Sequence, residues 1–163
     1  MRLSVTNPTA EALEPLVPVF RKVGKLWNIE PVTLAAICWR ETDFGLALNA
    51  DGTGDFGHGR GLMQIDDRWH ADWIKSANWR DPETNIGKGA EIYIEGLARL
   101  EDAGFSGDGL ELAAFAVYNA GFDRVWAAVR AGKSQDAPTT GGDYGQWCNA
   151  ARSLLAPRFE VSR

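Results

Sequence analysis

The feature that most constrains the fold of this chain is a run of residues, 32–39, that is apolar on almost every side of a helix. Pro31 precedes the run and suits the first position of a helix. A helix without a polar face has to be buried, because water on any side would meet apolar side chains. The sequence therefore predicts a central buried helix that begins at Pro31 and ends near Gly45.

Further helices are predicted on both sides of this central helix. Apolar residues recur at three- and four-residue spacing over 13–27, which indicates one amphipathic helix despite Pro15 and Pro18 near its start. Asp108 and Glu111 have the spacing of a capping box at the start of another helix. The helices expected after the central one run over 81–100, 108–121, 123–131 and 143–155, with a loop at 138–142.

Residues 49–65 interrupt the helical pattern with glycines at 52, 54, 57, 59 and 61, which are too dense for a helix. This stretch predicts loops with two or three short strands. A helical body with one small sheet commonly forms a cleft between the two parts. The expected fold class is mainly α (α+β), with a small sheet lobe beside a cleft, in a single domain over residues 1–163.

Composition excludes several classes of protein. The formal net charge is −5, whereas a nucleic-acid backbone needs clustered Lys and Arg, so no nucleic-acid partner is expected. The longest apolar runs are far shorter than the ~20 residues that span a bilayer. Residues 1–17 show no basic-then-apolar leader. Cys38 and Cys148 lack the spacing of a zinc site or a disulfide framework, which favours two inert thiols and no cofactor.

One carboxylate stands at the end of the central apolar run, in the sequence Trp39-Arg40-Glu41. The partial negative charge of a helix C-terminus and apolar surroundings both disfavour an ionised glutamate. A glutamate that stays protonated in this way is suited to act as a general acid. The alternative is an exposed last-turn residue paired with Arg40, and position alone does not decide between the two.

The glycine-rich stretch supplies further carboxylates. Asp51, Asp55, Asp66 and Asp67 are expected in one neighbourhood, on a backbone whose glycines let a substrate approach closely. One protonated Glu facing ionised Asp side chains is the arrangement that glycoside hydrolysis requires. Acidic glycine-rich loops also occur in calcium sites, but the spacing and closing Glu of an EF-hand are absent, so no metal is expected.

Aromatic residues are numerous, with 7 Trp, 3 Tyr and 7 Phe. Flat rings bury area against the faces of sugars while their polar tips bind hydroxyls. Most Trp residues of a helical domain belong to the core, so about two thirds of these are expected to be structural. Neither His58 nor His70 has a nucleophile motif nearby, which leaves the carboxylates as the candidate catalytic groups.

Four motifs, in order, resemble those of soluble lytic transglycosylases and goose-type lysozymes. They are RETDFG at 40–45 for the catalytic Glu, GRGLMQI at 59–65, NIGKGAEIYI at 85–94 and VYNAG at 117–121. Agreement of four ordered motifs over roughly residues 30–150 is far more specific than a single match. The resemblance implies a lysozyme-like fold and peptidoglycan as the substrate, and GDFGHGRGLMQIDDRWH at 54–70 is closer to the goose-type lysozymes.

The resemblance also implies roles for individual residues. Goose-type lysozymes carry Asp residues that flank the Gly-Leu-Met-Gln segment, here Asp55 and Asp66, and their presence favours a hydrolase. By this resemblance Glu41 is the general acid, Asp66 positions or deprotonates water, and Asp55 supports Asp66. The residues implied to line the saccharide cleft are Gln64, Tyr118, Asn119 and Tyr144.

The expected function is therefore that of a muramidase, which hydrolyses the β-1,4 bond between N-acetylmuramic acid and N-acetylglucosamine by inversion and without metal. Lytic transglycosylation by the same Glu41 and a non-catalytic peptidoglycan-binding module are the alternatives. The expected partner is the peptidoglycan glycan strand, and the chain is expected to be a monomer. The missing leader and the acidic body suit cytoplasmic synthesis with release to the cell wall, as in a phage endolysin, or a chain whose leader has been removed. The disulfide-forming N-terminal cysteines of vertebrate goose-type lysozymes are absent.

Overall fold

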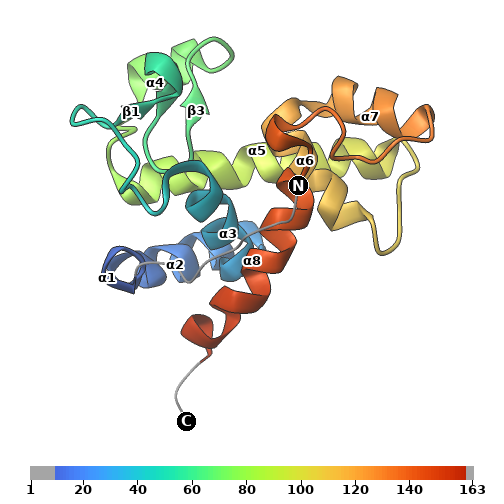
Figure 1. The fold of residues 1–163 in the computed structure, drawn as a ribbon. Coiled ribbons are helices and arrows are strands. Elements are labelled where there is room, and N and C mark those ends of the chain that lie inside the picture. The colour runs from blue at the N-terminus through green and yellow to red at the C-terminus, as the bar shows by residue number, and fades with distance from the viewer. Residues whose placement is uncertain (1–9, 161–163) are drawn as a thin grey trace. The chain divides into compact units, whose positions relative to one another are not determined.

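The computed structural model describes residues 10–160 (Figure 1). These residues group into two compact units. The first unit comprises residues 10–90 and 154–160, and the second comprises residues 91–153. Two long helices, α5 (Pro82–Asp102) and α8 (Tyr144–Phe159), contribute residues to both units. The single domain over residues 1–163 stays a prediction.

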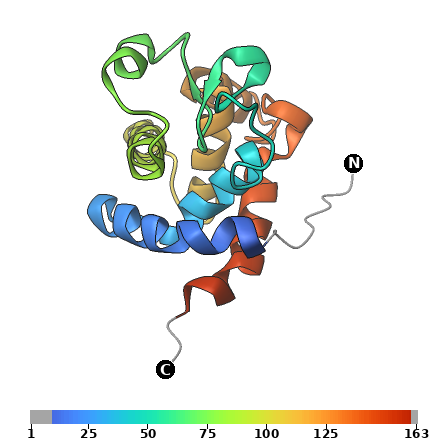
Figure 2. The ribbon, with the colours of Figure 1, turned by 90° about the vertical axis from the view of Figure 1, so that its left-hand side faces the viewer.

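Helices begin the first unit in three consecutive pieces, whereas the apolar spacing predicts one continuous helix. These pieces are α1 (Ala10–Leu13), the 3₁₀ turn η1 (Glu14–Leu16) and α2 (Val17–Trp27), which follow one another along one rod (Figure 2). Pro15 and Pro18 stand in the first turns of η1 and α2. Proline has no N–H and its ring clashes with a preceding helical turn, so the chain accommodates each proline at a new start. The expected continuity was wrong for this reason.

The central helix predicted from the apolar run is confirmed. Helix α3 spans Pro31–Thr42, and all residues over 33–39 are buried. Pro31 occupies its first turn, as predicted. The helix ends where Asp43 adopts a left-handed conformation with a φ of 49°. This stop leaves Glu41 in the last turn of a buried helix.

The glycine-rich stretch forms a small antiparallel sheet with the strand order β1-β2-β3. The three strands are β1 (Thr53–Gly54), β2 (Gly59–Arg60) and β3 (Ile65–Asp66). Gly54 pairs with Gly59, and Gly59 in turn pairs with Asp66. A 3₁₀ turn, η2 (Asp55–Gly57), joins β1 to β2, and a short helix, α4 (Ala71–Ser76), follows the sheet. The prediction of loops with two or three short strands is confirmed.

The second unit is helical. Besides its parts of α5 and α8, it contains α6 (Leu110–Ala120), α7 (Phe122–Arg130) and the 3₁₀ turn η3 (Thr140–Gly142). Helix α6 stops at Gly121, which has a φ of 82°, as predicted from the glycine. The predicted capping box of Asp108 and Glu111 is wrong, because α6 begins after Gly109 and no side chain caps it. Asp108 thus lies one residue too early to act as the N-cap.

These elements confirm the mainly α fold class. Within residues 10–160, no helix combines the length and the apolar character needed to cross a membrane. Cys38 and Cys148 are buried free thiols, as predicted. Burial raises the pKa of the Cys38 thiol far above its ordinary value, so this thiol stays protonated and unreactive.

Candidate active site

The end of α3 is fastened to the glycine-rich segment by the residue next to Glu41. Thr42 is 1% exposed, and its hydroxyl donates to the carbonyl of Leu62 at 2.9 Å. The same hydroxyl oxygen accepts a hydrogen bond from the backbone N–H of Gly45 at 3.1 Å. The helical turn that carries the half-buried Glu41 is thereby held against residues 59–65.

Asp66 lies at the end of strand β3 and is engaged on both carboxylate oxygens by Arg68. The Nε of Arg68 lies 2.9 and 3.0 Å from the two oxygens, and its Nη2 lies 2.5 Å from Oδ2. The backbone N–H of Arg68 also donates to Oδ1 at 2.8 Å. The side-chain hydrogen bonds from Arg68 are the main cause that lowers the pKa of Asp66, against a partial opposing effect of burial. Asp66 is therefore an ionised carboxylate at neutral pH.

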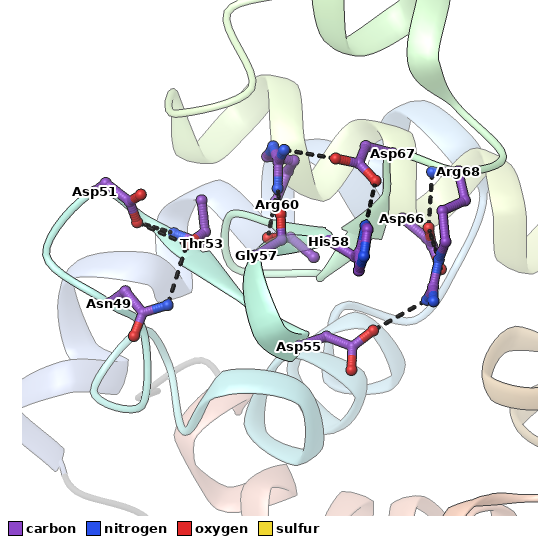
Figure 3. Close-up of polar contacts among 11 residues, drawn as sticks. Asn49, Asp51, Thr53, Asp55, Gly57, His58, Arg60, Asp66, Asp67 and Arg68 are labelled. Atoms are coloured by element: carbon purple, nitrogen blue, oxygen red, sulfur yellow. Dashed lines mark hydrogen bonds and ion pairs between the residues drawn. The ribbon is translucent and has the colours of Figure 1, made fainter.

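Arg68 also brings Asp55 and Asp66 together. Its Nη2 contacts Oδ2 of Asp55 at 3.1 Å, so one guanidinium bridges a carboxylate from η2 and one from β3 (Figure 3). The Asp55 side chain is 53% exposed, and its backbone has a left-handed φ of 46°. The next residue, Phe56, also has a left-handed φ, of 52°, and is fully exposed. Positive φ at two consecutive non-glycine residues costs energy, and such strain is typical of functional loops.

Gln64 packs against the sheet. Its Nε2 donates to the carbonyl of Gly61 at 2.9 Å. A Cβ added at Gly54 or Gly59 would lie 2.3 or 2.0 Å from the Oε1 of Gln64, so both glycines make room for this amide. Gln64 thus has a structural role in the sheet, and its predicted contact with saccharide stays a prediction.

The other predicted saccharide-binding residues belong to the second unit. Tyr118 is half-buried in the last turn of α6. The Oδ1 of Asn119 accepts a hydrogen bond from the backbone N–H of Thr140 at 2.9 Å, which ties the end of α6 to η3. Tyr144 is only 2% exposed and begins α8. Contact of these three residues with a saccharide stays a prediction.

Asp67 belongs to a second network in the sheet. Its carboxylate binds the Nδ1 of His58 at 2.9 Å and the Nη2 of Arg60 at 2.6 Å (Figure 3). From the sequence, His58 was weighed as a metal ligand or a triad member and not as a partner of Asp67, and Arg60, Arg68 and Thr42 were missed. The signal for Arg68 was its place two residues after Asp66, because an Asp side chain in a turn commonly bonds the backbone N–H two residues on, as it does here.

Asp51 does not join either network. Its Oδ1 accepts hydrogen bonds from the backbone N–H and the hydroxyl of Thr53, at 3.0 and 2.7 Å (Figure 3). The Thr53 turn binds this side chain locally, so Asp51 has other hydrogen-bond partners than Asp55, Asp66 and Asp67. The expectation that all four Asp residues share one neighbourhood stays a prediction. Over the described residues, no three His, Cys, Asp or Glu side chains are arranged to hold a metal ion.

Comparison with known proteins identifies the class of this chain as glycoside hydrolases of the lysozyme type. The lysozyme g family matches residues 5–152, and the chain belongs to this family. The resemblance to goose-type lysozymes drawn from the four motifs is thereby confirmed.

Individual relatives show how far this similarity extends. Lysozyme g of Casuarius casuarius is 31% identical over 136 residues, which cover 82% of this chain and 69% of that protein. Lysozyme g of Gallus gallus is 31% identical over 128 residues, which cover 77% of this chain and 56% of that protein. The match to lysozyme G of Dromaius novaehollandiae covers 58% of its length, so the chain spans little more than half of several relatives.

Proposed function

We propose that this chain is a muramidase that hydrolyses the β-1,4 bond between N-acetylmuramic acid and N-acetylglucosamine of peptidoglycan by inversion. The observation that carries the proposal is the ionised Asp66, held on β3 by Arg68, in the same unit as Glu41. Membership of the lysozyme g family supports the bond class. A protonated acid and a separate ionised carboxylate are the two groups that an inverting glycosidase requires.

Glu41 is the proposed general acid. Its place in the last turn of the buried helix α3 puts it at the partially negative end of the helix dipole. That field disfavours the ionised form and so favours a proton ready for transfer to the leaving oxygen. Thr42 holds this turn against the GRGLMQI segment, which favours a defined position for the proton.

Asp66 is the proposed partner of the attacking water. The lowered pKa of Asp66 makes its carboxylate a weak base but keeps the negative charge over the whole neutral range. Such a group is better suited to orient a water molecule and to stabilise an oxocarbenium-like transition state than to remove a proton early. Asp55 supports it by sharing the guanidinium of Arg68.

One observation favours lytic transglycosylation as a second candidate. Arg68 engages both oxygens of Asp66, which leaves this carboxylate less available to a water molecule. A transglycosylase uses Glu41 without an attacking water, because the 6-hydroxyl of the muramic acid closes the ring instead. The reaction then depends far less on Asp66.

Product masses test the proposal. Digestion of purified peptidoglycan by the wild type is expected to release muropeptides with reducing-end muramic acid. Asp66→Asn should lose far more activity than the matched variant Asp55→Asn. Products lighter by one water, from wild type and Asp66→Asn alike, would reassign the reaction to the transglycosylase. Binding to cell walls without any fall in turbidity would indicate a non-catalytic peptidoglycan-binding module instead of an enzyme.

A further inference from the structure

A hollow of about 260 Å³ lies in the first unit, apart from the carboxylates bridged by Arg68. Its lining includes Asp51, Gly52, Leu62, Trp79 and Arg80. Gly52 has a left-handed φ of 82°, and a Cβ at this position would lie 3.3 Å from the Trp79 ring. Glycine therefore keeps the edge of the indole open to the hollow.

Arg80 provides an oriented cation at this hollow. Its guanidinium carbon lies 4.0 Å from the centroid of the Trp79 ring, and its Nη2 donates to the backbone carbonyl of Asp51 at 3.2 Å. Arg60 also lies near this ring, at 5.8 Å, but its guanidinium is paired with Asp67. Arg80, in contrast, forms no ion pair within 4.0 Å among residues 10–160, and its contacts with the Trp79 ring and the Asp51 carbonyl hold the guanidinium in place.

Asp51 provides an oriented anion at the same hollow. The two bonds from Thr53 hold its Oδ1, and Asn49 in turn donates to the Thr53 hydroxyl at 3.1 Å. The hydrogen bond from the Thr53 hydroxyl is the main cause that lowers the pKa of Asp51, and the charge of Arg80 adds a smaller effect in the same direction. The Asp51 carboxylate is therefore ionised at neutral pH. Its second oxygen accepts no hydrogen bond from another described residue, so its lone pairs are available to a ligand.

We propose that this hollow binds the peptide stem of peptidoglycan, with a stem carboxylate on Arg80 and a stem ammonium on Asp51. The inference rests on the proposed function, because peptidoglycan carries such short zwitterionic peptides on its muramic acid residues. Two fixed charges of opposite sign around an apolar indole complement a zwitterionic peptide and have no counterpart on an uncharged sugar. Leu62 lines the hollow and its carbonyl also binds Thr42, so the hollow adjoins the turn that carries Glu41.

The test compares two soluble substrates that differ only in the stem. One is a peptide-bearing glycan oligomer, and the other is the same oligomer after an amidase has removed its peptides. Arg80→Gln is expected to raise KM about 10-fold on the peptide-bearing oligomer, because a charge-assisted hydrogen bond is lost. Its kcat on that oligomer and its KM on the stripped oligomer should not change. Asp51→Asn, which keeps an oxygen for the Thr53 turn, should raise KM on the peptide-bearing oligomer alone.

Arg99→Gln is the matched control. The Arg99 guanidinium also stacks on an aromatic ring, with its carbon 4.1 Å from the centroid of Phe122, but it belongs to the second unit. This variant should change KM on neither oligomer. An equal rise of KM on both oligomers for Arg80→Gln, or no rise on either, would overturn the stem site.

A binding measurement separates failure of this inference from failure of the proposed function. If the wild type cleaves neither oligomer, the proposed function fails. The free stem peptide released by the amidase is then titrated into the full chain, and the indole N–H resonance of Trp79 is followed by NMR. A saturable shift that Arg80→Gln abolishes would support the stem site independently of catalysis. Absence of that shift in the wild type would refute it.

Discussion

The bond between Thr42 and Leu62 predicts a measurable loss of stability and a larger loss of activity. Thr42→Val keeps the side-chain shape but removes the hydroxyl that donates to the Leu62 carbonyl at 2.9 Å. Gly45 keeps a second acceptor, the backbone carbonyl of Thr42 at 3.0 Å. The hydroxyl also lies 3.2 Å from the Cys38 carbonyl, so the substitution removes this longer contact together with the shorter bond to Leu62. Loss of one such bond in a buried setting costs about 1–2 kcal/mol. For a chain of this size, that cost lowers Tm by about 2–8 °C.

The activity of the same variant distinguishes a positioning role from a purely structural one. At 25 °C the variant should remain folded, yet a displaced Glu41 should lower kcat by up to ~10²-fold, because general acid catalysis tolerates little misplacement. The measurements are thermal unfolding by circular dichroism and turbidity loss of cell walls per folded molecule. Thr42→Ser, which keeps the hydroxyl, is the matched control and should retain most of the activity. Equal Tm and equal lytic rate for Thr42→Val and the wild type would contradict the positioning role of Thr42.

Three further predictions follow from individual contacts. Glu41→Gln should lower lysis by at least ~10²-fold without a change in the circular dichroism spectrum, because it removes the transferable proton; near wild-type lysis by a folded variant would exclude Glu41 as the acid. Gly59→Ala should cost ~1–3 kcal/mol, because its Cβ would lie 2.0 Å from the Oε1 of Gln64. In urea unfolding, the double variant with Gln64→Ala should then cost less than the sum of the single variants, and simple additivity would contradict the clash. The Asp66 contact with Arg68 should stabilise the fold above the ordinary carboxyl pKa of 3.8 and lose this effect as the pH falls through the lowered folded value. The free energy of unfolding of Asp66→Asn should therefore fall less than that of the wild type when the pH is lowered from 7 into the acid range. An identical fall in both proteins would contradict the stabilising contact between Asp66 and Arg68.

The long helices were predictable because their signals are local. The apolar run and Pro31 indicated the start and the burial of α3, and Gly121 indicated the end of α6. The prediction of one continuous N-terminal helix was wrong, because the spacing of apolar residues does not show where one helix ends and the next begins. The apolar residues over 13–27 keep the same spacing whether the helix is continuous or is interrupted at Pro15 and Pro18, so the spacing alone does not reveal the three pieces.

The sequence predicted which residue types form the candidate site, but it predicted few of the hydrogen-bond partners of these residues. The position of Glu41 after an apolar run and the carboxylates around the glycines were visible in the sequence, since each is a matter of residue type and local spacing. The bridge by Arg68 and the bond from Thr42 to Leu62 depend on which atoms the folded loops bring into hydrogen-bond distance, at 3.1 and 2.9 Å. Asn119 shows the same limit, because its bond to Thr140 requires η3 to fold back on the end of α6.

The register of the small sheet explains why the adjacent residues Asp66 and Asp67 enter different networks. Gly59 lies opposite Asp66, while the backbone N–H of Asp67 bonds the carbonyl of His58 at 3.0 Å. Successive side chains of a strand point to opposite faces, so one face carries Asp67 with His58 and its second neighbour Arg60.

The other face carries Asp66, and it is the face on which its paired neighbours Gly59 and Gly54 leave room for the amide of Gln64. A shift of one residue in this register would turn Asp66 and its local partner Arg68 away from Asp55, which lies next to β1. The glycines of the GRGLMQI region therefore do more than permit a tight turn. By admitting Gln64 over β1 and β2, they favour the one pairing in which Asp55 meets the proposed water-positioning carboxylate, Asp66, at the guanidinium of Arg68.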